Sequence, residues 1–169
     1  MNHRRRQLTL FVDDRQSAAI ESIRQKFNPQ QYRLIKAHVT LCREDEIESI
    51  ESVLYNLINL VLPKISLRFG RATRFSDDHG VLLPAIENLH SFRTLRKLIL
   101  QGIIEAPRIH EPHITLMHPR NSTCTDDIFQ QITQIILPAT ILFDKVSLIE
   151  QVEQGPWKTI QEFELKELA

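Results

Sequence analysis

The sequence has few glycines, few cysteines and no excess of charge, and each shortage excludes a class of protein. Four glycines occur, and no stretch is rich in Gly and Ser or in Pro, so nothing marks a flexible linker between domains. Two cysteines, Cys42 and Cys124, are too few for a disulfide framework or for a tetrahedral metal site. They fit a reducing compartment, and we expect a cytoplasmic protein.

The balance of charge limits the partners that the chain can bind. Lysine plus arginine number 21, and aspartate plus glutamate also number 21, so the formal net charge is zero. A protein that coats long nucleic acids needs a basic surface, so this class is disfavoured, whereas short or terminal nucleic-acid substrates stay open. No apolar run approaches the roughly 18 to 20 residues that cross a bilayer, and the stretch from Leu8 to Val12 is too short for a signal-peptide core. We therefore expect a soluble protein that does not enter a membrane.

What the sequence does contain is the pattern of one folded domain. A length of 169 residues with 42% hydrophobic residues is typical of a single soluble unit. Segments with strand character alternate with segments whose apolar residues recur at helical spacing, which predicts an α+β fold. Strands are expected over 7–12, 35–42, 64–69, 71–75, 81–85, 114–117, 141–152 and 158–165. Helices are expected between Asp14 and Phe27 and over 47–61, 89–99 and 128–136.

One short pattern occurs twice. The two copies read Ala37-His38-Val39-Thr40-Leu41 and Pro112-His113-Ile114-Thr115-Leu116. Each lies in a predicted strand before a predicted helix, and a little under half of the chain separates them. We infer a single domain over residues 1–169, made of two intertwined lobes about a pseudo-twofold axis. Each lobe then contributes one His-x-Thr strand to a central groove. The lobes are expected to pack together because either alone would be too small for an extensive core.

Strand geometry indicates what these motifs do. Successive side chains in a strand alternate faces, so His38 and Thr40 share one face, as do His113 and Thr115. The imidazole and the hydroxyl then lie about 6.6 Å apart along the strand, which leaves room for one phosphoryl group. A single His-x-Thr is usually a solvent-facing polar pair, but two matched copies favour catalysis. With an ordinary pKa near 6.5, histidine can act as base or as acid in phosphoryl transfer, and threonine can hold the phosphate oxygens. The motifs do not indicate which histidine is the base.

The paired His-x-Thr-hydrophobic motifs resemble those of the two-histidine phosphoesterase superfamily, which includes the bacterial 2′-5′ RNA ligase-like proteins and cyclic phosphodiesterases. The resemblance covers nearly the whole chain, including a closing hairpin over 146–149 and 157–165. It implies a bilobal fold around a central groove. It also implies metal-independent hydrolysis of 2′,3′-cyclic or related cyclic phosphates of RNA ends or nucleotides, without a cofactor. Some members ligate 2′-5′ RNA ends. By match to the motif, it implies His38, Thr40, His113 and Thr115 as catalytic residues.

Substrate-binding residues outside the motifs are weaker predictions. Phe11, on the first strand, and Trp157, near the final turn, are candidate stacking platforms for a base. Lys36, two residues before His38, is the best single cation for a phosphate. For Phe11 and Trp157 plain packing is the more common role of such residues, and for Lys36 solvation is an equally common one.

Two further histidines near the second motif are assigned no catalytic role. His110 and Glu111 would make a poor metal site with His113, because Pro112 breaks the helical face on which such ligands converge. By strand parity, His118 is expected to point away from His113.

Two other functions stay open from the sequence. One is a non-catalytic module that binds a nucleotide or an RNA end in the same groove. The other is a metal-dependent hydrolase, which requires carboxylates near the histidines. The sequence does not define the physiological substrate, its base or its length, and for the oligomeric state a monomer is favoured.

Overall fold

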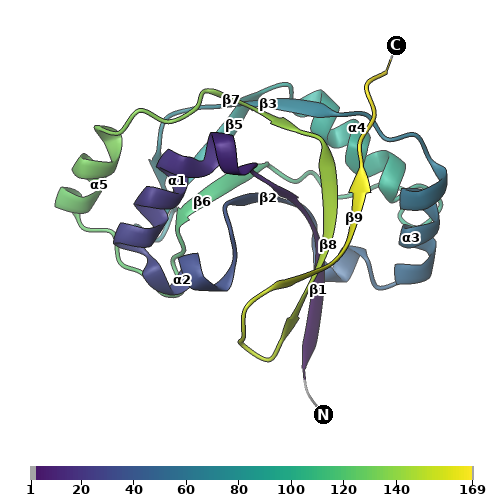
Figure 1. Cartoon of the computed structure of the whole chain (residues 1–169), viewed down its shortest axis with the longest axis horizontal. Coiled ribbons are helices and arrows are strands. Elements are labelled where there is room, and N and C mark those ends of the chain that lie inside the picture. Colours follow the sequence, from purple (N-terminus) through teal and green to yellow (C-terminus); the bar gives the residue numbers. More distant parts are fainter. Residues whose placement is uncertain (1–2, 169) are drawn as a thin grey trace.

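The computed structural model describes residues 3–168, in which strands and helices alternate along the chain (Figure 1). The strands are β1 Arg4–Phe11, β2 His38–Cys42, β3 Ile65–Phe69, β4 Thr73–Arg74, β5 Val81–Glu87, β6 His113–Met117, β7 Thr140–Phe143, β8 Lys145–Val152 and β9 Lys158–Glu164. The helices are α1 Asp14–Phe27, α2 Pro29–Leu34, the 3-10 turn η1 Glu44–Glu46, α3 Ile50–Asn59, α4 Leu89–Ile99 and α5 Asp126–Thr133. The predicted α+β class is confirmed. Within these residues no helix is both long enough and apolar enough to cross a bilayer.

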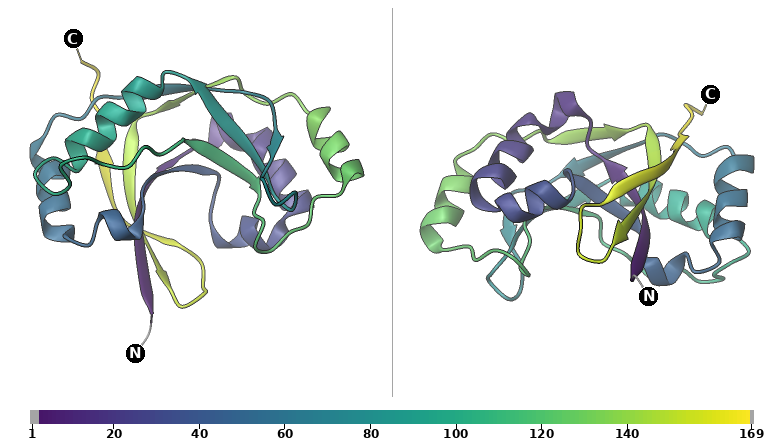
Figure 2. Two further views of the ribbon diagram at one scale, coloured as in Figure 1. Left: turned by 180° about the vertical axis from the view of Figure 1, so that it is seen from behind. Right: turned by 60° about the horizontal axis from the view of Figure 1, so that its bottom comes forward.

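The strands form one curled antiparallel sheet. Its hydrogen-bonded order is β7-β3-β5-β6-β2-β1-β8-β9, and β4 pairs with β5. The two histidine strands, β6 and β2, are therefore neighbours at the middle of this order. Figure 1 and the left view of Figure 2 show the sheet as an arch that is open on its concave side, with helices at both ends. The description of residues 1–169 as two intertwined lobes stays a prediction.

Strand alternation separates the core from the concave face. The apolar strand residues that are buried beside and within the two motifs include Leu8, Leu10, Val39, Leu41, Ile114 and Leu116. Helix α1 packs against β6 and helix α4 packs against β3. Burying each of these apolar side chains contributes roughly 1.5–3 kcal/mol relative to exposure. A slip of one residue would exchange the two faces of a strand, so this burial holds the histidines and threonines on the concave face.

The structure corrects the predicted elements at several points. Segment 141–152 is divided at Asp144, so that β7 pairs with β3 while β8 pairs with β1 and β9. Helix α2 was not predicted, and it begins at Pro29 because proline is well suited to the first position of a helix. The predicted helix 47–61 is shorter, since α3 spans Ile50–Asn59 and its N-terminal neighbour is the turn η1.

Candidate active site

The concave face of the sheet contains a cavity of about 680 Å³, and both His-x-Thr motifs line it. His38 and Thr40 reach it from β2, and His113 and Thr115 reach it from β6. All of these side chains are half-buried. The structure thus brings together the residues that the motifs single out.

The two motifs meet through a twofold arrangement of the backbone. Val39 of β2 is the register partner of Ile114 of β6, and the strands are antiparallel. One residue further in each direction, antiparallel register sets each histidine opposite the threonine of the other motif. The resulting cross-strand pairs are His38 with Thr115 and Thr40 with His113. Directly opposite residues have Cβ atoms about 4.5–5.5 Å apart. The two imidazoles and the two hydroxyls therefore lie close together around one small part of the concave face.

The backbone fixes both motif histidines in the same tautomer. Nδ1 of His38 lies 2.7 Å from the carbonyl oxygen of Lys36, and Nδ1 of His113 lies 3.1 Å from that of Glu111. A carbonyl oxygen can only accept, so in the neutral ring Nδ1 carries the hydrogen. Each Nε2 therefore keeps a free lone pair, which can take up a proton.

A phenylalanine ring contacts each of these imidazoles edge-on. Phe11 of β1 is 6.1 Å from the His38 ring, centroid to centroid, at an angle of 68°. Phe75, just after β4, is 5.8 Å from the His113 ring at 85°. This T-shaped geometry is favourable for aromatic pairs and restricts the rotation of each imidazole. Phe11 is thus placed against His38, and it is not among the cavity-lining residues.

The surroundings of His38 disfavour its charged form. Burial lowers the pKa of His38 to about 4, the hydrogen bond to the Lys36 carbonyl opposes this, and the positive charge of Arg24 acts with burial. Interactions with His113 and His118 lower the pKa further. His38 is therefore uncharged at neutral pH.

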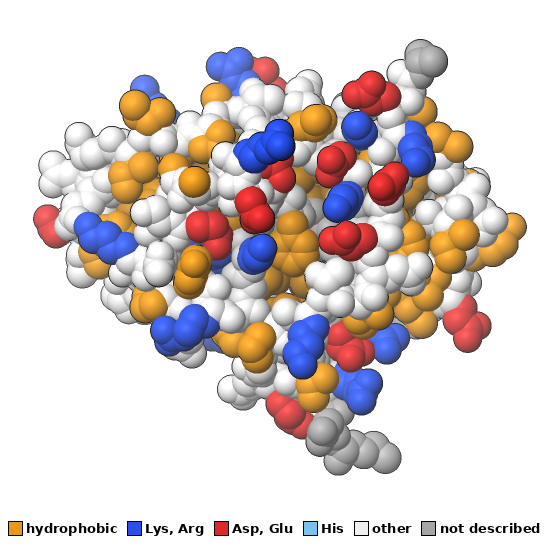
Figure 3. Space-filling view, viewed as in Figure 1, with side chains coloured by type: hydrophobic (Ala, Val, Ile, Leu, Met, Phe, Trp, Pro, Cys, Tyr) orange, Lys and Arg blue, Asp and Glu red, His pale blue; other side chains and the backbone are white. Residues whose placement is uncertain are grey.

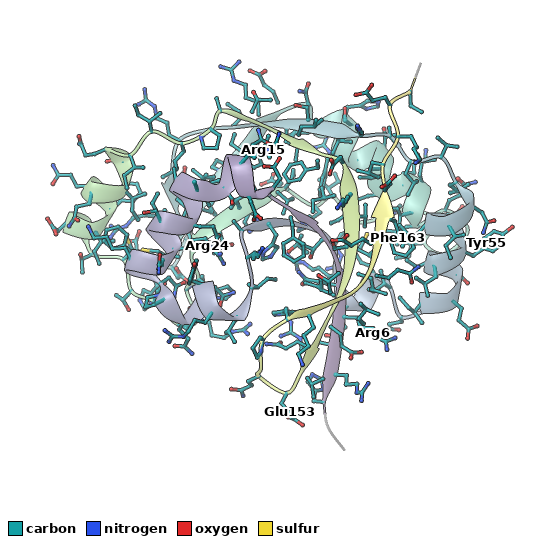
Figure 4. The ribbon with its side chains drawn as sticks, in the orientation of Figure 1. Arg6, Arg15, Arg24, Tyr55, Glu153 and Phe163 are labelled. Atoms are coloured by element: carbon teal, nitrogen blue, oxygen red, sulfur yellow. The ribbon has the colours of Figure 1, made fainter. Side chains whose placement is uncertain are left out.

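Arg24 of α1 (labelled in Figure 4) and its ion-pair partner Glu21, on the same helix, clamp the segment before β2 to that helix through backbone contacts. Arg24, which is 1% exposed, donates from Nη1 to Glu21 Oε1 at 2.6 Å and from Nη2 to the Ile35 carbonyl at 2.8 Å. The same Glu21 oxygen accepts from the Ala37 backbone N–H at 2.9 Å. These two backbone contacts flank the carbonyl that orients the His38 ring. The nitrogen Nε of Arg24 is buried and has no hydrogen-bond partner among residues 3–168.

A second buried arginine, on α4, supports the other end of β2. Arg96 is 2% exposed and donates from Nη2 to Glu46 Oε1 at 2.5 Å. It also donates to the backbone carbonyls of Leu41 and Arg108. Burial by itself raises the pKa of Glu46, but the hydrogen bonds from Arg96 and from the Arg43 backbone outweigh it and hold the pKa below its usual value. Arg96 thus joins β2 to the segment that leads into β6.

Two histidines that sequence reasoning set aside also line the cavity. The prediction that His118 points away from His113 is wrong, because β6 ends at Met117 and strand alternation does not extend beyond it. His110 is buried, and its Nε2 lies 3.0 Å from the Thr40 carbonyl. In residues 3–168, no group of three or more His, Cys, Asp or Glu side chains is placed to hold a metal ion.

Trp157 lines the cavity at the end that β1 and the β8–β9 hairpin form. The guanidinium carbon of Arg5 lies 5.4 Å from the Trp157 ring centre, within the range of a cation–π contact. The Trp157 backbone N–H donates to the Leu34 carbonyl at 2.8 Å, which ties this hairpin to α2 across the open side of the arch. Arg5 was not predicted from the sequence, although strand alternation sets it on the opposite face from its basic neighbours Arg4 and Arg6.

Lys36 lies outside the cavity. Its ammonium group is 3.5 Å from Asp14 Oδ1, and both side chains are exposed. Lys36 precedes the first residue of β2, so strand parity does not carry its side chain to the face of His38. Basic and acidic side chains are interspersed on the face drawn in Figure 3. Between β8 and β9, Lys145 Nζ lies 3.5 Å from Glu162 Oε2.

The fold and the paired motifs together define a class of protein. The sequence model of the 2′-5′ RNA ligase superfamily matches residues 12–155, which include both motifs. The chain belongs to this superfamily, whose members are phosphoesterases and ligases with two histidine motifs, and the resemblance stated above is confirmed.

Solved structures share the whole fold. Crystal structures of E. coli LigT with phosphate and with NADP+ align with TM-scores of 0.64 and 0.65, at 16% and 15% identity. Each alignment covers 99% of this chain and 100% of LigT. A crystal structure described as a phosphoesterase aligns over 98% of this chain and 100% of its own, with a TM-score of 0.64 and 16% identity. No curated protein sequence matches the chain. The predicted two-histidine phosphoesterase fold is confirmed.

Proposed function

We propose that the protein hydrolyses 2′,3′-cyclic or related cyclic phosphodiesters, at RNA ends or in small nucleotides, through acid–base catalysis by His38 and His113. The observation that carries this proposal is the arrangement of the two motifs in the cavity: around the register pair of Val39 and Ile114, each histidine lies opposite the threonine of the other motif. In-line displacement at phosphorus needs a base on the attacking water and an acid on the opposite, leaving oxygen. Imidazoles from two antiparallel strands suit these opposed positions.

In the proposed reaction, a water oxygen forms a bond to phosphorus while one of the two ring ester bonds breaks. Nε2 of the base accepts a proton from the attacking water, and Nε2 of the acid donates its proton to the departing ribose oxygen. The product is a phosphate monoester with a neighbouring free hydroxyl. After one turnover the two imidazoles have exchanged protonation states, and exchange with water restores them. Every proton is carried by this chain or by water, so the step itself requires no cofactor or metal.

The environment of His38 favours it as the base. Because its pKa is lowered to about 4, the ring is neutral and its Nε2 lone pair is free at pH 7. His113 is then the acid. The hydroxyls of Thr40 and Thr115 donate hydrogen bonds to the non-bridging phosphate oxygens, where negative charge accumulates in the transition state.

Substrate contacts outside this centre fall to Trp157. Its ring lines the cavity and offers a surface on which a base can stack, and Arg5 beside it brings positive charge to that end of the cavity. Phe11 contributes by packing on His38. Lys36, outside the cavity, is left with at most a role in attracting the anionic substrate from solution. E. coli LigT, which shares this fold, has been crystallised with phosphate, 3′-AMP and NADP+, which supports a nucleotide phosphate as ligand.

Turnover assays test the proposal. Purified protein with EDTA is incubated with the four 2′,3′-cyclic nucleotides and with oligoribonucleotides that end in a 2′,3′-cyclic phosphate, and the monoester product is measured. His38→Ala and His113→Ala should each reduce the rate at least a hundredfold. His79→Ala, at an exposed residue in a turn, is the matched control. Activity retained in both motif variants would contradict the proposal.

Two outcomes would point to other activities of the same cavity. Binding of these nucleotides without turnover would favour a non-catalytic nucleotide or RNA-end binding module. Joining of RNA ends through a 2′-5′ linkage, in a parallel assay, would add the ligase activity that the superfamily name carries.

A further inference from the structure

The cavity contains an imidazole whose hydrogen bonding is the reverse of that of the two motif histidines. In His38 and His113, Nδ1 donates to a carbonyl and Nε2 keeps its lone pair. In His118, Nδ1 lies 3.1 Å from the backbone nitrogen of Arg120 and accepts its N–H. A nitrogen that accepts cannot carry a hydrogen of its own, so the neutral His118 ring has its hydrogen on Nε2.

The position of His118 is held by contacts on both sides of its backbone. Its N–H donates to Asn28 Oδ1 at 2.8 Å, and Asn28 is 1% exposed. Its carbonyl accepts from Ser122 Oγ at 2.7 Å. Nδ1 already accepts a hydrogen bond within this loop. The ring lines the cavity, and its Nε2–H is the donor that remains for a ligand there.

The surroundings of His118 disfavour its charged form. Burial lowers the pKa of His118, and interactions with Arg120 and with His113 lower it further, whereas the carboxylate of Asp77 opposes them. His118 in turn contributes to the lowered pKa of His38, so its ring lies within electrostatic reach of both motif histidines.

We propose that His118 is a further substrate-contacting residue, which donates a hydrogen bond from Nε2 of an uncharged ring to a phosphoryl oxygen of the substrate. The identity of the acceptor rests on the phosphodiesterase function proposed above. The bonding of Nδ1 makes His118 unsuitable as the general acid or base, because protonation would place two N–H groups against each other at the Arg120 backbone. A neutral donor holds a phosphoryl oxygen without adding a second positive charge beside the protonated acid of the catalytic pair.

Two substitutions separate the hydrogen-bond donor from the loop contact. In His118→Asn, the side-chain oxygen can still accept from the Arg120 N–H, but no donor reaches the former position of Nε2. In His118→Gln, the longer side chain can set an N–H at that position. With 2′,3′-cyclic AMP we expect kcat/KM to fall about tenfold in His118→Asn and to stay within about threefold of wild type in His118→Gln. The same substitutions at the exposed His90 of α4 are the controls.

The results that would overturn the proposal are distinct. Wild-type kcat/KM in His118→Asn would mean that Nε2 contacts no substrate. A loss in His118→Gln as large as in His118→Asn would mean that the ring itself, and not its N–H donor, is required. A loss above a thousandfold in both would indicate a proton-transfer role, which the proposal excludes.

Two measurements do not depend on turnover. Nitrogen-15 NMR of the imidazole rings at pH 7 should show His118 as the Nε2–H tautomer and His38 as the Nδ1–H tautomer. Calorimetric titration with 3′-AMP should show the same order of variants, about tenfold weaker for His118→Asn. If the wild type hydrolyses no cyclic phosphate but these results hold, the proposed function fails, while the role of His118 as a hydrogen-bond donor to a bound phosphate stands. A protonated His118 ring, or its Nδ1–H tautomer, at pH 7 would overturn the proposed role of His118.

Discussion

His110 donates a hydrogen bond to the backbone carbonyl of Thr40 at 3.0 Å. The bond joins the segment before one histidine motif to the hydroxyl-bearing residue of the other, beside the single register pair between β2 and β6. The His110 ring also lies 6.4 Å from the His113 ring, centroid to centroid. Burial lowers the pKa of His110 to about 4, and nearby Arg96 acts in the same direction, so this contact persists as a neutral hydrogen bond at neutral pH. The two motifs are thus connected by the His110 side chain as well as by the sheet.

The pH dependence of kcat/KM tests the assignment of His38 as the base. A general base must be unprotonated, and burial lowers the pKa of His38 to about 4. Because kcat/KM reports the ionisation of the free enzyme, we expect its acidic limb near pH 4 and not near the ordinary histidine value of about 6.5. A profile that falls already between pH 7 and 6 would contradict the assignment.

Stability should decrease as the pH falls through the range of histidine titration. The pKa values of His38, His110 and His118 are all lowered by burial in the folded state. Between their unfolded value of about 6.5 and their folded values, the unfolded chain binds more protons, so the free energy of unfolding rises with pH in this window. Each such histidine contributes a slope of at most about 1.4 kcal/mol per pH unit. Urea denaturation between pH 7.5 and 4.5 measures the slope, and His110→Asn should make it shallower.

The Arg24 clamp should contribute to both stability and catalysis. Arg24→Met leaves Glu21 without its buried partner, so we expect a loss of about 3 kcal/mol in the free energy of unfolding. It also removes a charge that lowers the pKa of His38, so the acidic limb of kcat/KM should move to higher pH, whereas Arg24→Lys should leave it in place. Urea denaturation and pH profiles measure these effects.

Arg15→Met is the control for this clamp, because Arg15 lies on the same helix and is exposed (Figure 4). If Arg24→Met changes neither the free energy of unfolding nor the pH profile of kcat/KM more than Arg15→Met does, the Arg24 clamp contributes to neither stability nor catalysis.

Trp157 should affect substrate binding more than chemistry. Stacking of a base on an aromatic ring contributes about 1–3 kcal/mol, so Trp157→Ala should raise KM at least fivefold with kcat within about threefold of wild type. Trp157→Phe should recover most of the affinity. Tyr55→Ala is the control, since Tyr55 is 66% exposed on α3 and does not line the cavity (Figure 4). An unchanged KM in Trp157→Ala would place the base elsewhere.

Most elements were predictable because hydrophobic periodicity is local. The apolar spacing of Phe92, Leu95 and Ile99 predicts α4, and all three side chains are buried. Strand partners were not predictable, because β7 pairs with β3 across an interval of the chain that local patterns do not span. The buried Arg24 escaped prediction for a related reason: an arginine on a helix is normally exposed, and its burial depends on the backbone carbonyl of Ile35 in another segment.

By itself, the sequence determined which residues carry the candidate chemistry and that each histidine shares a strand face with a threonine, because that alternation depends on the backbone of a few consecutive residues. Only the tertiary structure decided that the two motifs are adjacent and which imidazole nitrogens are free. It also decided that His110, His118 and Arg5 share the cavity. These properties depend on hydrogen-bond partners and strand pairings distant along the chain, which no local pattern specifies.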